Sequence, residues 1–227
     1  MIDPISEKYA MLWSGGKDSC LALWRAREEG LRVDGLLNFF DGSSNRVRFH
    51  AVRTELIAQQ ARALRLELFQ YATSPDSFTI TFGEALKALK VGGYTGLVAG
   101  DIHLDSVRQW NEEQVTGVGI RLVEPLWHDG GPALLQAFIE AGFRAVLTCC
   151  DDRWADALWP GREIDHNFIL DVSRIADLDA CGENGEYHSF VFDGPLFSQR
   201  INWLPGEIRR LNGFSQLDLV LESAFTA

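Results

Sequence analysis

The sequence has few cysteines, and none of them is placed for a zinc ribbon or a redox dithiol. The chain has 227 residues, and its four cysteines are Cys20, Cys149, Cys150 and Cys181. None of them forms a CxxC pair, which both kinds of site commonly use. We predict buried free thiols, since unpaired cysteine is among the most buried residue types. His128 and His166 have no partners at ligand spacing, so no zinc site is predicted.

Positive charge and long apolar runs are also scarce. Lys and Arg total 21 against 32 Asp and Glu, which gives a formal net charge of −11. The chain therefore lacks the basic field that gathers DNA or RNA, and nucleic acid is not the expected partner. No apolar run reaches the length of about 20 residues that spans a bilayer. The segment from Met1 to Lys8 has no signal-peptide pattern, so we expect a cytoplasmic protein with no membrane partner.

Short apolar runs alternate with amphipathic segments along the first half of the chain. Strands are predicted at residues 9–13, 33–40, 66–71, 97–99 and 120–123, and helices at 19–29, 53–64, 78–89 and 104–116. This alternation is typical of an α/β fold with a doubly wound parallel sheet. Ligands of such sheets bind at the carboxyl ends of the strands.

A cluster of Gly and Pro at residues 124–132 indicates a domain boundary. We predict a first domain at residues 1–125 and a second, smaller α+β domain at 126–227. In the second domain, helices are expected at 134–141 and 171–179, and strands at 145–149, 187–192 and 217–221.

The string Ser14-Gly15-Gly16-Lys17-Asp18-Ser19 lies between the first predicted strand and the first predicted helix. Glycines let the backbone turn sharply and approach an anion, and the following helix N-terminus favours phosphate. Lys17, expected in an exposed loop, adds positive charge, and Ser14 and Ser19 add hydroxyl groups. Asp18 would cap the helix or help to hold a magnesium ion that bridges phosphates.

Two other phosphate motifs are excluded at this position. A Walker A loop needs a glycine where Met11 stands, and no GxGxxG pattern follows the first strand. Gly117-Val118-Gly119 is interpreted as a turn that ends a helix. The alternative for the Ser14 loop is a tight turn without a ligand, but the order and position of its six residues favour phosphate binding.

The string SGGKDS resembles the PP-loop of the ATP pyrophosphatase superfamily, which is similar to the adenine nucleotide alpha hydrolases. The resemblance implies a HUP/Rossmann-like first domain that binds ATP and cleaves it to AMP and pyrophosphate. We assign Lys17 and Asp18 to catalysis, Asp18 also to Mg²⁺, and the whole loop from Ser14 to Ser19 to ATP binding.

A second string narrows the family. The residues from Glu183 to Phe197, ENGEYHSFVFDGPLF, resemble a signature of the diphthine–ammonia ligase family, and Glu124-Pro125-Leu126-Trp127 resembles a shorter segment of it. The resemblance implies an amide ligase that adenylates a carboxylate and lets ammonia displace AMP. Asn184 stands where the family usually has glycine, and Asp101 stands where we expect a smaller residue. These departures resemble a prokaryotic branch, and they leave the acceptor unidentified.

The segment from Glu183 to His188 is a dense polar cluster beside an apolar strand. From the residues alone, a glycine-containing turn with solvated carboxylates explains it better than a substrate wall. The resemblance favours the wall, with Glu186 or His188 taking the proton of ammonia. The substrate-binding residues are then His50, Glu183, Asn184, Gly185, Glu186 and Tyr187, and the catalytic ones include Glu186 and His188.

Two further positions have open alternatives. Gly100 and Asp101 follow a predicted strand and are assigned to the ATP site, where Asp101 would contact ribose or magnesium. Helix capping by Asp101 or Asp105 explains the same pattern. His50 precedes a helix and would contact substrate, or else it caps the helix or is partly buried.

The expected partners are ammonia from solution and a carboxylate on a small molecule or a protein. A homodimer is compatible with the sequence. Two other functions stay open: a regulatory module that holds ATP without turnover, and a PP-loop enzyme that modifies a nucleotide or RNA. The missing CxxC pair and the acidic charge disfavour tRNA thiolation.

Overall fold

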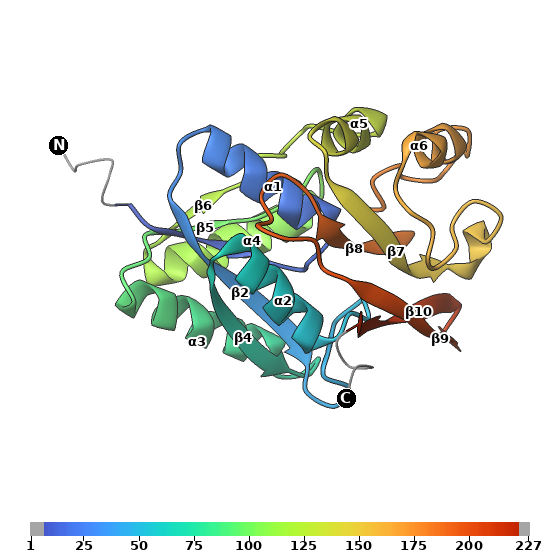
Figure 1. Cartoon of the computed structure of the whole chain (residues 1–227). Helices are drawn as coiled ribbons and strands as arrows, with labels where there is room; N and C mark the ends of the chain where they lie inside the picture. The colour runs from blue at the N-terminus through green and yellow to red at the C-terminus, as the bar shows by residue number, and fades with distance from the viewer. Residues whose placement is uncertain (1–6, 223–227) are drawn as a thin grey trace. The chain divides into compact units, whose positions relative to one another are not determined.

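The computed structural model describes residues 7–222 and divides the chain into two compact units (Figure 1). The first unit is Met1–Ser14, Asp18–Asn45 and Leu66–His128, and the second is Gly15–Lys17, Arg46–Arg65 and Asp129–Ala227. The units therefore interleave along the chain, and most of the predicted Met1–Lys8 segment lies outside the described residues. The functional division at residue 125 stays a prediction.

The first unit is built on five parallel strands in the order β4-β2-β1-β5-β6. Its elements are β1 (Tyr9–Leu12), nearly all of α1 (Lys17–Glu28), β2 (Val33–Asp41), β4 (Glu67–Thr73), α3 (Phe78–Val91), β5 (Gly96–Val98), α4 (Asp105–Val118) and β6 (Arg121–Val123). The predicted doubly wound parallel sheet is confirmed.

Both faces of this sheet are covered. Leu37 and Leu97 pack in one core with Phe82, Leu86 and other apolar residues of α3 and α4. Met11, Leu36 and Val98 alternate with that face and are also buried. Figure 1 shows α1 and α3 on opposite sides of the sheet. Apolar side chains on both faces explain why these strands appear in the sequence as continuous apolar runs.

The order in which strands are added to the sheet reverses at β1, because β2 pairs with one edge of β1 and β5 with the other. A doubly wound sheet opens a crevice outside the carboxyl ends of the two strands at such a switch point. Ser14 follows β1 and Gly100 follows β5, so the two predicted ATP-binding segments of this unit flank the switch point.

The second unit contains an antiparallel sheet in the order β8-β7-β10-β9. Its elements are β3 (Arg46–Val47), α2 (Thr54–Leu64), α5 (Pro132–Glu140), β7 (Arg144–Asp151), the 3-10 helix η2 (Asp152–Trp154), α6 (His166–Val172), β8 (Tyr187–Asp193), β9 (Trp203–Leu211) and β10 (Phe214–Leu221). Helices α5 and α6 pack together (Figure 1). The second, α+β part of the fold prediction is confirmed.

The predicted helix at residues 171–179 is wrong. The helix in this region is α6, which begins after Asp165, whose side chain accepts a hydrogen bond from the backbone N–H of Phe168. It ends at Val172, and Asp177 has a positive φ of 64°, which a helix does not allow. The aspartates of this stretch favour turns and caps over helix interiors.

Candidate functional site

The loop between β1 and α1 is buried at its glycines, where it has no room for side chains. Gly15 has a φ of 84°, and a Cβ atom there would lie 2.6 Å from Cδ1 of Ile57. A Cβ atom on Gly16 would lie 2.7 Å from Cε1 of His50 and 3.1 Å from the carbonyl oxygen of Ser189. Both positions require glycine, and the loop leads directly into the N-terminus of α1. That geometry suits an anion.

The glycine part of the loop belongs to the second unit and is anchored there. The carbonyl oxygen of Gly15 accepts hydrogen bonds from the backbone N–H of Val191 at 2.9 Å and from Nε2 of Gln60 at 2.9 Å. The backbone N–H of Lys17 donates to Oγ of Ser189 at 3.1 Å. Strand β8 and helix α2 therefore fix the loop's conformation without any ligand.

Lys17 does not lie in an exposed loop, so that prediction is wrong. It is the first residue of α1 and is only 4% exposed. Its Nζ donates a hydrogen bond to the carbonyl oxygen of Cys181 and lies 5.0 Å from the centre of the Tyr187 ring. The ammonium group is buried because a carbonyl and an aromatic face replace water around it.

The polar groups at the start of α1 lie close to a buried carboxyl group in the first unit. The hydroxyls of Ser14 and Ser19 are 3.3 Å apart, and Asp18 lies in the first turn of α1. A Cβ atom on Gly100 would lie 2.9 Å from the backbone of Asp18. Burial, and next the Asp18 charge, raise the pKa of Asp101 to about 6.

Asp101 and Asp105 do not cap a helix. The N-cap of α4 is Leu104, and no side chain caps it. Asp101 instead accepts a hydrogen bond at 2.8 Å from Nδ2 of Asn111. The capping alternative is therefore wrong, and a role for Asp101 toward ribose or magnesium stays a proposal.

Glu186 has a carboxylate oxygen that is buried without a partner. The residue is 3% exposed, and its Oε1 accepts hydrogen bonds from the backbone N–H of Asp179 at 3.0 Å and from Nδ2 of Asn184 at 3.3 Å. Its Oε2 is buried and accepts no hydrogen bond. The explanation of this segment as a turn with solvated carboxylates is therefore wrong for Glu186. Such an oxygen is costly unless a ligand or a proton meets it.

Two imidazoles lie beside the loop in the second unit. The ring centres of His50 and His188 are 4.8 Å apart. Nδ1 of His50 is 2.9 Å from the carbonyl oxygen of Ser189, which can only accept, so Nδ1 carries the proton in that bond. Burial, and then the charges of His50 and Lys17, hold the pKa of His188 well below its usual value. His188 is therefore neutral at pH 7.

Comparison with known proteins matches both halves of the chain to one family. A model described as the diphthamide synthase N-terminal domain matches residues 7–122, and one described as the diphthamide synthase C-terminal domain matches residues 131–218. The chain belongs to the diphthamide synthase family. The two matched ranges together contain every predicted site residue, and they leave the short segment around Pro125 unmatched.

Members of this family from animals and yeast are similar to the chain over most of its length. It is 26% identical to the diphthine–ammonia ligase of Mus musculus over 222 residues, which are 86% of this chain and 82% of that protein. It is 26% identical to that of Danio rerio over 220 residues, or 84% of each protein. The Schizosaccharomyces pombe protein is 24% identical over 211 residues, which are 35% of its length.

The two departures from the family pattern both contact a polar side chain. Asn184, where glycine was expected, donates to Oε1 of Glu186. Asp101, where a smaller residue was expected, is the carboxyl group that Asn111 holds. Both predicted site positions therefore take part in side-chain hydrogen bonds.

Glu124 is another acidic residue of the first unit, and its charge interacts with that of Asp101. It was not among the predicted site residues. Its side chain is 3% exposed, its Oε2 is 3.1 Å from Nε of Arg108, and its Oε1 is buried without a partner. Burial, and then the charge of Asp101, raise its pKa to about 7. Its position directly after β6, like that of Asp101 after β5, was the signal in the sequence.

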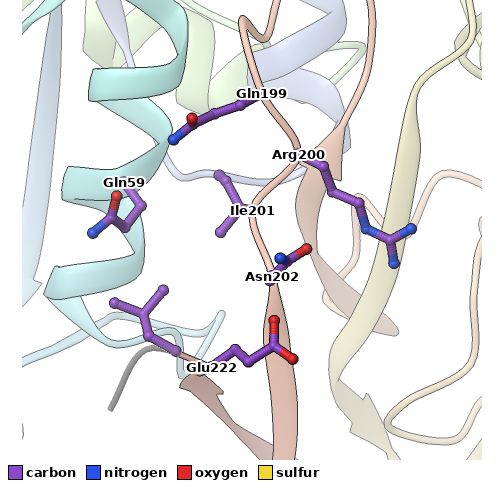
Figure 2. A pocket seen from close by; sticks show the side chains of 7 residues that line it. Gln59, Gln199, Arg200, Ile201, Asn202 and Glu222 are labelled. Carbon is purple, nitrogen blue, oxygen red and sulfur yellow. The ribbon is translucent and has the colours of Figure 1, made fainter. Parts of the chain in front are cut away.

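A polar depression of about 450 Å³ lies elsewhere in the second unit (Figure 2). It is lined by Gln59, Gln199, Arg200, Ile201, Asn202, Leu221 and Glu222. None of these is a predicted site residue. Within residues 7–222 no cluster of three or more His, Cys, Asp or Glu side chains could hold a metal, and no helix is long and apolar enough to cross a membrane.

Proposed function

We propose that this protein is an ATP-dependent ligase that cleaves ATP to AMP and pyrophosphate, adenylates a carboxylate and transfers ammonia to it. Its family and its relatives named diphthine–ammonia ligase support the ligase part. The observation that carries the nucleotide part is the loop at Gly15 and Gly16, which has no space for side chains and opens onto a helix N-terminus.

The first step in this proposal is attack by a carboxylate oxygen of the acceptor on the α-phosphorus of ATP. The bond between the α-phosphorus and the bridging oxygen breaks, and pyrophosphate leaves with the electron pair. Lys17 and the backbone N–H groups of the loop stabilise the charge that develops on pyrophosphate, and Ser14 and Ser19 contribute hydroxyl donors. No covalent bond to the protein is needed.

Asp18 and Asp101 have the oxygen ligands that Mg²⁺ prefers, and they lie close enough for their charges to interact. Bound there, the ion would take its remaining ligands from phosphate and water, and it would neutralise phosphate charge. A magnesium ion also offsets the repulsion that two carboxylates would otherwise exert on ATP.

In the second step ammonia attacks the acyl carbon, a C–N bond forms, and the C–O bond to AMP breaks. The nitrogen must lose a proton. We assign this transfer to the Oε2 atom of Glu186, which is buried without a partner, and to the imidazole of His188. We assign Glu183, Asn184, Gly185 and Tyr187 to the surrounding substrate wall, and His50 to acceptor contact.

The test uses the purified protein with [α-³²P]ATP, magnesium and ammonium chloride. A protein that carries diphthine is tried first as acceptor, followed by fractionated carboxylate metabolites. Acceptor-dependent release of AMP supports the proposal. Release of ADP contradicts it, and tight ATP binding with no turnover toward any acceptor would instead support a regulatory module.

A further inference from the structure

The segment 46–53, which leads into α2, has a backbone that must be held in place. Phe49 has a φ of 65° and Ala51 a φ of 57°, and neither residue is glycine. Such left-handed conformations persist only where the surrounding structure fixes them, and they are concentrated at functional sites. Two such conformations within three residues indicate that this segment has a functional role.

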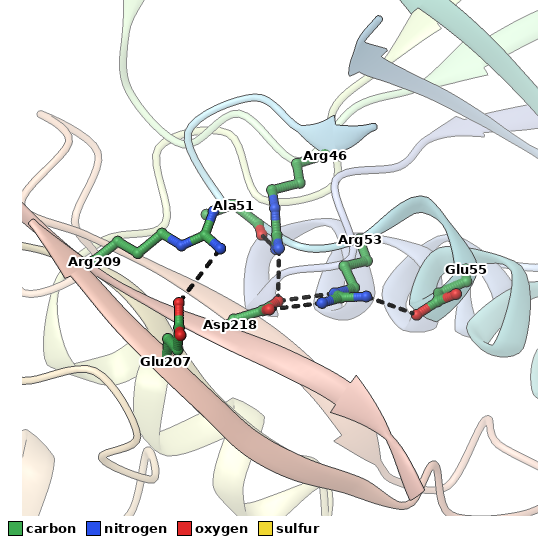
Figure 3. Close-up of polar contacts among 7 residues, drawn as sticks. All are labelled: Arg46, Ala51, Arg53, Glu55, Glu207, Arg209 and Asp218. Carbon is green, nitrogen blue, oxygen red and sulfur yellow. Dashed lines mark hydrogen bonds and ion pairs between the residues drawn. The ribbon is translucent and has the colours of Figure 1, made fainter. Parts of the chain in front are cut away.

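One carboxylate of β10 holds both ends of this segment (Figure 3). Asp218 accepts hydrogen bonds from Nε of Arg53 at 2.9 Å and Nη2 of Arg53 at 2.7 Å, and Nη2 of Arg46 lies 2.8 Å from its Oδ1. Nη1 of Arg46 also donates to the carbonyl oxygen of Ala51 at 2.8 Å. The arginines, first Arg53, lower the pKa of Asp218 to about 2, so it stays charged.

The segment presents two rings to His188. The Phe49 ring is 67% exposed and lies 5.9 Å from the His188 ring with an interplanar angle of 24°. The His50 ring lies 4.8 Å from His188 and is also against Gly16 of the loop. The three rings form a face beside the phosphate loop, and we call it the ring face.

We propose that the ring face of Phe49, His50 and His188 receives an apolar or aromatic group next to the acceptor's carboxylate, and that Asp218 is the residue that positions it. This inference rests on the proposed function. An exposed phenyl ring offers contact area to flat or apolar groups, and the guanidinium of Arg48 already lies 5.3 Å from the centre of the Phe49 ring. Asp218 binds Arg46 and Arg53, and it acts through segment 46–53.

The first test of this inference needs no activity. In the ligand-free protein, Asp218→Asn keeps the size of the side chain but removes the charge that holds Arg46 and Arg53. We expect the imidazole proton resonances of His50 and His188 to shift, because the Phe49 ring moves and its ring-current effect on both imidazoles changes. We also expect the pKa of His188 to rise toward its ordinary value. Glu207→Gln is the control, since Glu207 is exposed on β9 and pairs with Arg209 at 3.5 Å (Figure 3). Unchanged resonances in Asp218→Asn would overturn the positioning role.

The second test uses Phe49→Leu, whose exposed position does not endanger folding even if Asp218→Asn proves unstable. With the acceptor identified by AMP release, we expect KM for the acceptor to rise about tenfold and KM for ATP to stay unchanged. Ile80→Ala, at a 66% exposed position of α3, is the control and should change neither value. An unchanged acceptor KM in Phe49→Leu overturns the ring face as acceptor site. Absence of AMP release from the parent protein would instead contradict the proposed function, and the resonances would still decide the role of Asp218.

Discussion

The ammonium group of Lys17 donates a hydrogen bond to the backbone carbonyl of Cys181. The phosphate loop is thereby tied to the segment that precedes β8, which also carries Glu186 and leads into His188. An ammonium group has three N–H donors, so this bond does not exclude a phosphate contact. The lysine that we assign to pyrophosphate thus belongs to the same hydrogen-bonded structure as the groups that we assign to ammonia.

Replacing Lys17 by Met should lower AMP formation roughly a hundredfold, because one charge-assisted contact in a transition state is worth about 3 kcal/mol. Met is used because Lys17 is buried, and alanine would add a cavity to the loss of charge. AMP release at saturating ATP measures the effect. Lys90→Met is the control, since Nζ of Lys90 also donates to a carbonyl, that of Gly119, at 2.6 Å. Equal rates for the two variants would remove Lys17 from the catalytic residues.

Gly16→Ala should weaken ATP binding. The new Cβ atom would lie 2.7 Å from His50 and 3.1 Å from the backbone of Ser189, so one of them must move. A displacement of this kind costs about 1–3 kcal/mol, which corresponds to roughly 5- to 150-fold in affinity. Gly117→Ala is the matched control, because a Cβ atom there meets nothing within 4 Å and alanine favours its helix, α4. Titration with a fluorescent ATP analogue compares them, and parent-like affinity for Gly16→Ala would argue against the loop as the ATP site.

Glu124→Gln should stabilise the protein at neutral pH but not in acid. The pKa of Glu124 is raised from 4.5 to about 7 in the folded state, so the folded protein keeps a proton that the unfolded chain loses. The stability of the parent therefore falls as pH rises between about 4.5 and 7, and this loss disappears in the neutral glutamine variant.

Urea unfolding at pH 4.5 and pH 8 checks this expectation for Glu124. Relative to the parent, the free energy of unfolding of Glu124→Gln should increase from pH 4.5 to pH 8. That of Glu84→Gln, at an exposed position of α3, should not. The same pH dependence in parent and Glu124→Gln would mean that the pKa of Glu124 is not raised in the folded protein.

Joint replacement of Glu186 by Gln and His188 by Asn should preserve ATP binding and reduce product formation. Positioned acid–base groups contribute roughly 10²–10⁴-fold, so a loss of about a hundredfold or more is expected. The two quantities are measured on the same preparation, by nucleotide titration and by AMP release with ammonium present. Lost ATP binding would assign the pair to the nucleotide, and full turnover would leave both residues without a catalytic role.

The parallel sheet could be predicted because its signal is local. Runs such as Tyr9–Leu12 are apolar at every position, since both sheet faces are covered, and each is followed by an amphipathic helix. The hairpin of β9 and β10 was missed even though Asn212 and Gly213, with φ values of 52° and 81°, form its turn. An Asn-Gly pair between strands is a strong hairpin signal, but β9 is exposed along almost its whole length and lacks an apolar pattern.

The site could be predicted only in part, because its remaining contacts join residues that are distant in sequence. The loop from Ser14 to Ser19 is continuous and could be recognised, but the partner of Lys17 is Cys181, which is 164 positions away. The hydrogen bond from Arg53 to Asp218 also joins residues that are far apart in sequence. No spacing rule connects such residues, and the interleaved units show how far the chain returns on itself. A homodimer stays a prediction.

Oxygen transfer tests most directly whether the acceptor's carboxylate attacks the α-phosphorus of ATP, which is the central step of the proposed reaction. The acceptor found by AMP release is labelled with ¹⁸O in its carboxylate and turned over with ATP, magnesium and ammonium, and the AMP is analysed by mass spectrometry. We expect AMP to gain a single ¹⁸O atom from the carboxylate and the product to be an amide. AMP without ¹⁸O, or ADP in its place, would contradict carboxylate adenylation.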